Sequence, residues 1–317
     1  MNASLDRFAP QPCALPNPVY AGPMTWRVLE LFAGLGGWRL AFRGIGSVVA
    51  AYDISPHANA TYALNHGERP RARELASVPI RELAAHGADT WALSPPCQPT
   101  CRMGLKRDLE DPRSKAFLHL LEVLAEAPPE RLVLENVAGF PGSGSHARLV
   151  ALLERLGFQR ADLLLCPTAL GIPNQRPRFY LIAARHPVRL MAPEPLEPAP
   201  LAPYLDPESD PDLILSPEEV ARFGPGLDLV EPTDKRSTCF IGGYGQRYVG
   251  SGSFLRLEDG RLRRFSPAEV ARLLGYPEGF RFPEPLPREA RYKLLGNGLS
   301  LPAARWIVEN LISSAPA

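Results

Sequence analysis

The chain has no long apolar run and few cysteines. None of its 317 residues falls in a stretch of 18 or more apolar residues, the length that a transmembrane helix requires. The first 25 residues lack the basic start, apolar centre and cleavage site of a secretion signal, and we expect them to form a proline-dotted leader. The five cysteines are an odd, scattered set in a chain too large to need disulfides. These absences indicate a cytoplasmic protein that is not attached to a membrane.

Composition also gives little support to a metal site and does not decide whether the chain binds nucleic acid. Cys97 and Cys101 have no second cysteine pair at ligand spacing, and no histidine falls in a zinc-like pattern, so we expect no metal. The formal net charge of +1 neither favours nor excludes nucleic acid. Contact with nucleic acid would have to come from local basic clusters such as Arg102, Lys106 and Arg107, although such clusters are often only solvated surface.

Apolar segments alternate with helical patterns through the first part of the chain. We expect strands at 28–32, 48–53, 90–93, 131–135 and 179–183, with helices between them. This alternation predicts an α/β fold with a doubly wound, mostly parallel sheet. Residues 187–232 are rich in proline and acidic residues, and glycines alternate with aromatics from 236 to 262. We therefore expect a leader at 1–25, a first domain at 26–186, a smaller irregular or β domain at 187–290, and a return to the first domain at 291–317.

Cys97 is the most informative residue, in the segment Ser-Pro-Pro-Cys-Gln at 94–98. The two prolines stiffen a loop that directly follows an apolar strand. Open α/β sheets place their chemistry in loops at the carboxyl ends of strands, which makes Cys97 a candidate nucleophile. A small, buried core cysteine fits this local motif equally well.

A glycine-rich turn, Phe32-Ala33-Gly34-Leu35-Gly36-Gly37, follows the first expected strand. Such a turn lets a ligand approach the backbone, although glycines also simply make tight turns. Asp53 ends the next strand about 20 residues later, where an acidic residue can hold ribose hydroxyls or merely cap a helix. Because the phosphate-binding spacing is incomplete, the pattern favours a nucleoside ligand without phosphates.

Three further groups lie at strand or helix boundaries. Glu135 ends an apolar strand, where its carboxylate would either share a crevice with the thiol loop or cap the next element. Arg176 and Arg178 precede another strand, and could hold a carboxylate or a nucleic-acid backbone, or form surface pairs. A glycine-asparagine turn, Gly296-Asn297-Gly298, stands at the start of the last helix.

Together and in this order, these blocks resemble the cytosine-5 methyltransferase family. The resemblance covers about residues 26–186 and 265–312. The segment Cys239-Phe240-Ile241 and the glycine-rich residues after it are similar to a signature of the small tRNA-modifying branch, the DNA methyltransferase 2 type. This resemblance implies a Rossmann-like class I methyltransferase domain, a target-recognition domain at 187–290, and S-adenosylmethionine as the methyl donor.

The resemblance also implies roles for individual residues. Cys97 would add as a thiolate to carbon 6 of cytosine, and Glu135 would contact the ring nitrogen and the exocyclic amine. Arg178 would hold the base carbonyl, with Arg176 supporting this network. The residues expected to contact the methyl donor are Phe32, Gly34, Gly36, Asp53, Ile54, Glu74, Leu75, Pro96 and Asn297. The residues expected to contact nucleic acid are Gln98, Arg102, Lys106, Cys239, Phe240 and Tyr244.

The branch that the chain resembles methylates cytosine 38 in the anticodon loop of tRNA, usually aspartate tRNA, and we expect this substrate and a monomeric enzyme. A DNA (cytosine-5) methyltransferase is the first alternative, although residues 187–264 are few for reading base edges in a DNA groove. The second is an inactive module that binds S-adenosylmethionine or nucleic acid, which intact Cys97 and Glu135 argue against. The chain departs from the family pattern at Asn174, Ile241 and Gly298.

Overall fold

The computed structural model describes residues 26–96, 112–208 and 210–314. These residues divide into two compact units. The larger unit contains the described residues of 26–166, 177–193 and 303–314, and the smaller one those of 167–176 and 194–302. The domain boundaries expected from the sequence stay a prediction.

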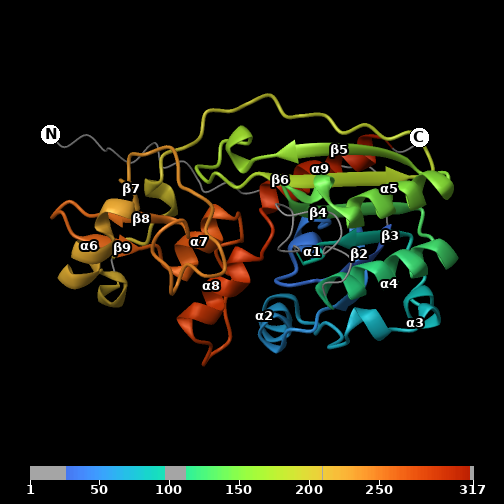
Figure 1. The fold of residues 1–317 in the computed structure, drawn as a ribbon, viewed down its shortest axis with the longest axis horizontal. Helices are drawn as coiled ribbons and strands as arrows, with labels where there is room; N and C mark the ends of the chain where they lie inside the picture. Colours follow the sequence, from blue (N-terminus) through green and yellow to red (C-terminus); the bar gives the residue numbers. More distant parts are fainter. Residues whose placement is uncertain (1–25, 97–111, 209, 315–317) are drawn as a thin grey trace, which may run out of the picture. The chain divides into compact units, whose positions relative to one another are not determined.

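In the described part of the larger unit, six strands form one sheet in the order β2-β1-β3-β4-β6-β5 (Figure 1). The first four are parallel to one another, and β6 is antiparallel to both β4 and β5. This confirms the mostly parallel sheet. The sequence reading missed the edge strand β5, because its residues are largely exposed and lack the apolar run of a central strand. The strands are β1 (Trp26–Leu31), β2 (Gly46–Tyr52), β3 (Thr90–Leu93), β4 (Arg131–Val137), β5 (Gln159–Leu165) and β6 (Arg178–Ala184).

Helices pack on both faces of this sheet, as a doubly wound fold requires. Leu29 and Leu31 of β1 belong to the hydrophobic core that α4 and α5 cover. Glu30, which points to the opposite face, accepts hydrogen bonds from α1 and α2. The helices of this unit are α1 (Gly37–Ala41), α2 (Pro56–His66), α3 (Ile80–Ala84), α4 (Pro112–Glu126), α5 (Gly144–Arg155) and nearly all of α9 (Leu301–Ser313).

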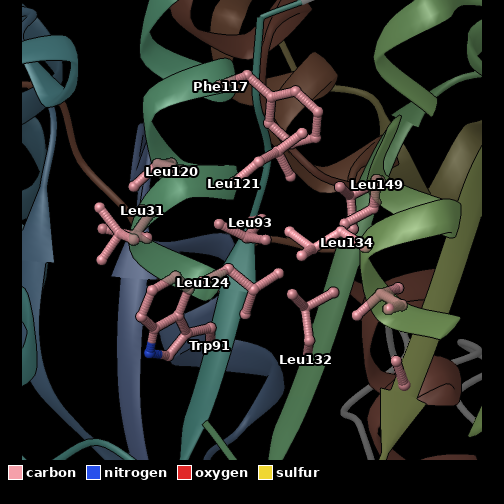
Figure 2. Packing of buried hydrophobic residues seen from close by; sticks show 14 of the residues in the cluster. Leu31, Trp91, Leu93, Phe117, Leu120, Leu121, Leu124, Leu132, Leu134 and Leu149 are labelled. Carbon is pink, nitrogen blue, oxygen red and sulfur yellow. The ribbon is translucent and has the colours of Figure 1, made fainter. Parts of the chain in front are cut away.

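The main core lies between α4 and the centre of the sheet (Figure 2). Phe117, Leu120, Leu121 and Leu124 recur at helical spacing, so they share one face of α4. Figure 2 shows these side chains among Leu31, Trp91, Leu93, Leu132 and Leu134 of β1, β3 and β4. Because those three strands are buried along most of their length, their carboxyl ends are held rigidly side by side at one edge of the sheet.

Helix α1 has only five residues and is held at both ends. At its start, Glu30 accepts hydrogen bonds from the backbone amides of the first turn at 3.1 and 3.2 Å. At its end, Arg305 of α9 donates to the carbonyl oxygens of Ala41 and Arg43 at 2.9 and 2.7 Å. A helix this short is marginal alone, so these side chains supply the stability that its length does not.

The smaller unit is an irregular β domain. Its described residues contain a three-stranded sheet in the order β7-β8-β9. A serine caps the helix that begins at Pro267: Ser266 Oγ accepts a hydrogen bond from the Glu269 amide at 3.1 Å, and the Glu269 carboxylate accepts one from the Ser266 amide at 2.6 Å. The elements are β7 (Asp228–Val230), β8 (Ser253–Arg256), β9 (Leu262–Arg264), α6 (Pro217–Phe223), α7 (Pro267–Leu273) and α8 (Arg288–Gly296).

Candidate active site

The glycine turn, residues 32–37, joins β1 to α1 in an unusual backbone conformation. Phe32, Gly34 and Gly36 have φ angles of 58°, 53° and 78°, in the left-handed region that favours glycine. A Cβ atom at Gly36 would lie only 2.3 Å from Nε2 of His66, so the turn also requires glycine for space. His66 Nε2 lies 3.0 Å from the carbonyl oxygen of Leu35, which ties α2 to the turn. The turn therefore has a backbone shape that few other sequences could adopt.

Asp53 follows the end of β2 and binds the same turn. Its carboxylate accepts hydrogen bonds from the amides of Gly34 at 2.8 Å and Ser55 at 2.8 Å. Burial raises the pKa of the Asp53 carboxyl, although these two amides oppose the rise. Each oxygen of a carboxylate can accept more than one hydrogen bond, so both the capping role and the ribose-binding role that the sequence left open are compatible with this geometry.

Ile54, directly after Asp53, is 65% exposed, which is unusual for a large apolar side chain. An apolar surface beside a carboxylate suits a nucleoside, which has an aromatic base next to a ribose. Of the other residues expected at the methyl donor, Glu74 and Pro96 are exposed. Leu75 is only 4% exposed and packs in the main core, so its side chain supports the fold of this region.

Residues 94–96, here called the thiol-loop stem, leave the carboxyl end of β3. Ser94 Oγ accepts a hydrogen bond from the indole Nε1 of Trp38 in α1 at 2.9 Å. The carbonyl oxygen of Pro95 accepts one from the side-chain amide of Asn136 in β4 at 3.1 Å. The stem is thus anchored to the helix after the glycine turn and to the strand that carries Glu135. Cys97, Gln98, Arg102 and Lys106 lie outside the described residues, and their expected roles stay predictions.

Glu135 and Arg178 form an ion pair at the same edge of the sheet. Glu135 lies near the end of β4 and Arg178 at the start of the antiparallel strand β6. Arg178 Nε is 3.3 Å from Glu135 Oε1, and the two side chains are 14% and 12% exposed. An ion pair this shielded orients both groups, because the planar guanidinium constrains the plane of the carboxylate. The structure thus brings together two residues that the resemblance places at the base.

Arg176, two residues earlier, belongs to the smaller unit and has different partners. Its guanidinium donates to the carbonyl oxygens of Gly296 at 2.9 Å and Gly298 at 2.7 Å. It also donates to the Phe240 carbonyl oxygen and to Cys239 Sγ, both at 3.2 Å. Arg176 therefore holds two backbone segments of the smaller unit together. These contacts are those of a residue that organises its unit, and its expected part in the catalytic network stays a prediction.

Two of the residues expected to contact nucleic acid are instead in the core of the smaller unit. Phe240 is 4% exposed and Tyr244 is fully buried. The hydroxyl of Tyr244 donates to the Ser253 carbonyl and accepts from the Phe265 amide, at 2.7 and 2.9 Å. The expectation that these two side chains contact nucleic acid is therefore wrong, because their aromatic rings are needed for packing. Cys239 is partly exposed.

Asn297 and Asn174 also lie in the smaller unit. Asn297 is the exposed residue that ends α8, and its expected contact with the methyl donor stays a prediction. A Cβ atom at the preceding Gly296 would lie 2.1 Å from the amide nitrogen of Gly242, so this turn packs against the backbone of residues 241–242. Asn174 is buried and donates to Ser237 Oγ at 3.1 Å and to the Thr238 carbonyl at 3.0 Å.

Comparison with known proteins identifies this arrangement. The family model described as C-5 cytosine-specific DNA methylase matches residues 26–210 and 231–313. The chain belongs to this family. A human tRNA (cytosine(38)-C(5))-methyltransferase is 31% identical to this C-5 methylase, over 87% of this chain and 96% of the human protein. The Schizosaccharomyces pombe protein of the same name is also 31% identical, over 90% and 96%. The crystal structure of S. pombe Dnmt2 methyltransferase superposes with a TM-score of 0.83 at 29% identity, covering 91% of this chain and 98% of that one.

S-adenosylmethionine is the methyl donor of C-5 methylases. The larger unit has features that fit this molecule: a glycine turn in a left-handed backbone conformation, the Asp53 carboxylate bound to that turn, and the exposed apolar side chain of Ile54. No helix among the described residues is long and apolar enough to cross a membrane. The described part of this methylase also holds no group of side chains suited to a metal ion.

Sequence reasoning missed Trp38, Ser94 and Asn136, which anchor the thiol-loop stem. Their signal was weak, because a serine before two prolines and an asparagine after a glutamate are common loop residues. Only the hydrogen bonds at 2.9 and 3.1 Å show that they position the stem. Glu30 was missed for a similar reason, since a single acidic residue within an apolar strand can as easily face solvent.

Proposed function

We propose that this C-5 methylase transfers a methyl group to carbon 5 of a cytosine in tRNA, at position 38 of the anticodon loop in a tRNA of the aspartate type. The relatives that are 31% identical to it carry the name tRNA (cytosine(38)-C(5))-methyltransferase, which supports the choice of substrate. The Glu135–Arg178 pair beside the anchored thiol-loop stem is the observation that carries the chemistry. We also propose that the enzyme acts as a monomer in the cytoplasm. Sedimentation of the purified protein measures its oligomeric state.

Cytosine carbon 5 is too weak a nucleophile to accept a methyl group without activation. In the proposed reaction, the Cys97 thiol loses its proton to solvent, and the thiolate adds to carbon 6, which raises the electron density at carbon 5. S-adenosylmethionine supplies the methyl group. Loss of the carbon 5 proton to solvent and release of the Cys97 thiolate from carbon 6 then restore the aromatic ring.

Glu135 and Arg178 act on the base in this scheme. Glu135 would bind the ring nitrogen and the exocyclic amine, and assist protonation of that nitrogen as electron density builds during thiolate addition. Arg178 would hold the base carbonyl while its bond to Glu135 keeps the carboxylate in the orientation that this contact needs. The target base must leave its stack to reach these groups, which costs less in a loop than in a duplex.

The glycine turn would hold the methyl donor. Phe32, Gly34 and Gly36 would present their backbone to it, while Asp53 and Ile54 would bind its ribose and adenine. The anchored stem that carries Pro96 begins at the neighbouring strand β3. In this proposal, donor and thiol would meet at the carboxyl ends of β1 and β3.

Duplex DNA is the alternative substrate, because the matching family model is named for DNA methylation. Labelled S-adenosylmethionine, supplied with an aspartate tRNA transcript or with duplex DNA, separates the two. We expect label in the tRNA only, and no label in a matched transcript with uridine at position 38. Label in DNA but not in tRNA would refute the tRNA proposal.

The thiol is tested in the same assay. Cys97→Ala is expected to abolish transfer, while Cys101→Ala, which removes a second thiol of the same segment, is expected to keep it. If Cys97→Ala transfers label as well as wild type does, the covalent mechanism is wrong. Glu135→Gln is expected to lower kcat strongly while the affinity for S-adenosylmethionine stays within about twofold, since the residue acts on the base.

A further inference from the structure

Glu30 is a buried carboxylate that the proposed reaction does not use. It is the residue before the last of β1 and is fully buried. Oε1 accepts hydrogen bonds from the backbone amides of Trp38 and Arg39 at 3.1 and 3.2 Å. Oε2 accepts one from the hydroxyl of Tyr62 in α2 at 2.8 Å. An ionised acid in a protein core is costly, so a structure that keeps one has to supply hydrogen bonds to it.

All three bonds connect Glu30 to the two elements that border the glycine turn. Residues 38 and 39 begin α1 directly after the turn, and Tyr62 lies on α2, whose His66 contacts the turn carbonyl of Leu35. A Cβ atom at Gly36 would lie 2.9 Å from the Tyr62 ring, so the ring also limits where the turn can lie. Glu30 therefore holds the glycine turn from behind, on the side away from the side chains that would face a ligand.

The partners of Glu30 are arranged for its charged form. Three donors and no acceptor point at its oxygens in these bonds, which suits a carboxylate because a carboxylate only accepts. A protonated carboxyl is a weaker acceptor, and its own proton would compete with one of the three donors.

We propose that Glu30 and Tyr62 are positioning residues for the glycine turn, and that ionisation of Glu30 makes the affinity for the methyl donor depend on pH around neutrality. This inference rests on the proposed role of the turn in binding S-adenosylmethionine. The charged form of Glu30 holds the start of α1 firmly, and the neutral form lets the turn relax away from its binding conformation.

The charged and titratable groups around Glu30 support a transition near neutrality. Burial raises the pKa of Glu30 to about 7, and the Tyr62 hydroxyl is the strongest of the groups that oppose the rise. Arg39 also opposes it, and pairs with Glu68 at 3.0 Å. His66 packs its ring against Tyr62, and burial lowers the pKa of this imidazole, which favours its neutral form beside Glu30. The neighbours of Glu30 on β2 and β3 are alanines.

The test measures the dissociation constant of S-adenosylmethionine by calorimetry without tRNA, at pH 6, 7 and 8. The donor's own ionisation is common to all variants, so only ratios between variants are read. If the charged form alone binds well, the ionised fraction falls about tenfold from pH 8 to pH 6. Glu30→Gln cannot titrate at this position. The dissociation constant of the wild type, divided by that of Glu30→Gln, is therefore expected to rise about tenfold as the pH falls from 8 to 6.

Tyr62→Phe and Tyr52→Phe form a matched pair. Both tyrosines are fully buried in the larger unit, and the Tyr52 hydroxyl likewise meets a glutamate and a histidine, Glu82 at 3.1 Å and His86 at 2.8 Å. Only Tyr62 contacts Glu30. Tyr62→Phe is expected to move the midpoint of donor affinity upward by about 0.7 pH unit, the size expected for one lost hydrogen bond, while Tyr52→Phe leaves it in place.

Two results would overturn the inference. One is an equal shift in both tyrosine variants, which would mean that the effect is general loosening of the unit. The other is a pH profile of Glu30→Gln that matches wild type, which decides the question even if Tyr62→Phe fails to fold. A wild-type protein that binds no donor at any pH would instead contradict the proposed function of the turn.

Discussion

Glu30→Gln is expected to change how the stability of the protein depends on pH. The pKa of Glu30 rises from 4.5 to about 7 on burial. The folded state therefore holds this proton more tightly than the unfolded chain does, and carries more bound protons between these two values. Stability falls wherever the folded state binds more protons as pH rises, so ionising Glu30 destabilises the wild type progressively up to about pH 7.

The magnitude follows from the size of this shift. At about 1.4 kcal/mol per pH unit, a rise from 4.5 to about 7 corresponds to about 3 kcal/mol in the free energy of unfolding. About 2 kcal/mol of this change falls between pH 5.5 and 8, the range in which most proteins stay folded. Glutamine has nearly the same shape and no charge, so the variant lacks this part of the pH dependence.

Urea unfolding of both proteins, followed by circular dichroism between about pH 5.5 and 8, measures the difference. Other titrating groups are common to both and cancel in the comparison. The free energy of unfolding of Glu30→Gln, relative to wild type, is expected to rise by about 2 kcal/mol toward pH 8. A relative stability that stays constant within about 0.5 kcal/mol would refute the raised pKa and the pH sensitivity inferred from it.

Two further substitutions test the site and the core. Asn136→Ala removes the hydrogen bond to the Pro95 carbonyl, and is expected to lower kcat about tenfold or more with little change in donor affinity. Asn65→Ala, which loses a hydrogen bond within α2, is the control and is expected to keep kcat in the same transfer assay. Leu134→Ala, at a fully buried position, is expected to lower the free energy of unfolding in urea by about 3 kcal/mol. Leu164→Ala, at a 59% exposed position, is expected to lower it by less than about 0.5 kcal/mol. Equal losses would contradict the core in Figure 2.

The larger unit was readily predicted from the sequence because its central strands are continuous apolar runs. β1, β3 and β4 are buried along most of their length, and each is followed by a motif that stands at the same edge of the sheet. The edge strand β5 gave no comparable signal, since an edge strand needs to bury little of its surface.

The backbone conformation of the glycine turn could be predicted from the sequence, whereas the packing of aromatic side chains could not. The glycine turn needs φ angles that only certain residues adopt, and this requirement is visible in the residue types themselves. Phe240 and Tyr244 were expected at the nucleic acid because of the resemblance to the tRNA-modifying branch, and a resemblance of motifs does not show which side chains are buried. They pack together in a core that also contains Phe265 and Tyr292, residues that lie 20 or more positions further along the chain.

The sequence by itself determined the class of fold, the family and the chemistry. Strand order along the chain, the glycine turn and the motif around Cys97 are local patterns, and a local pattern is readable without knowing what lies across the sheet. Only the tertiary structure decided which polar groups are buried together. Glu30 meets Tyr62 across 32 positions, and Asn136 meets Pro95 across 41. Such contacts depend on how strands and helices pack, because burial and charge are properties of the surroundings that folding brings to a residue.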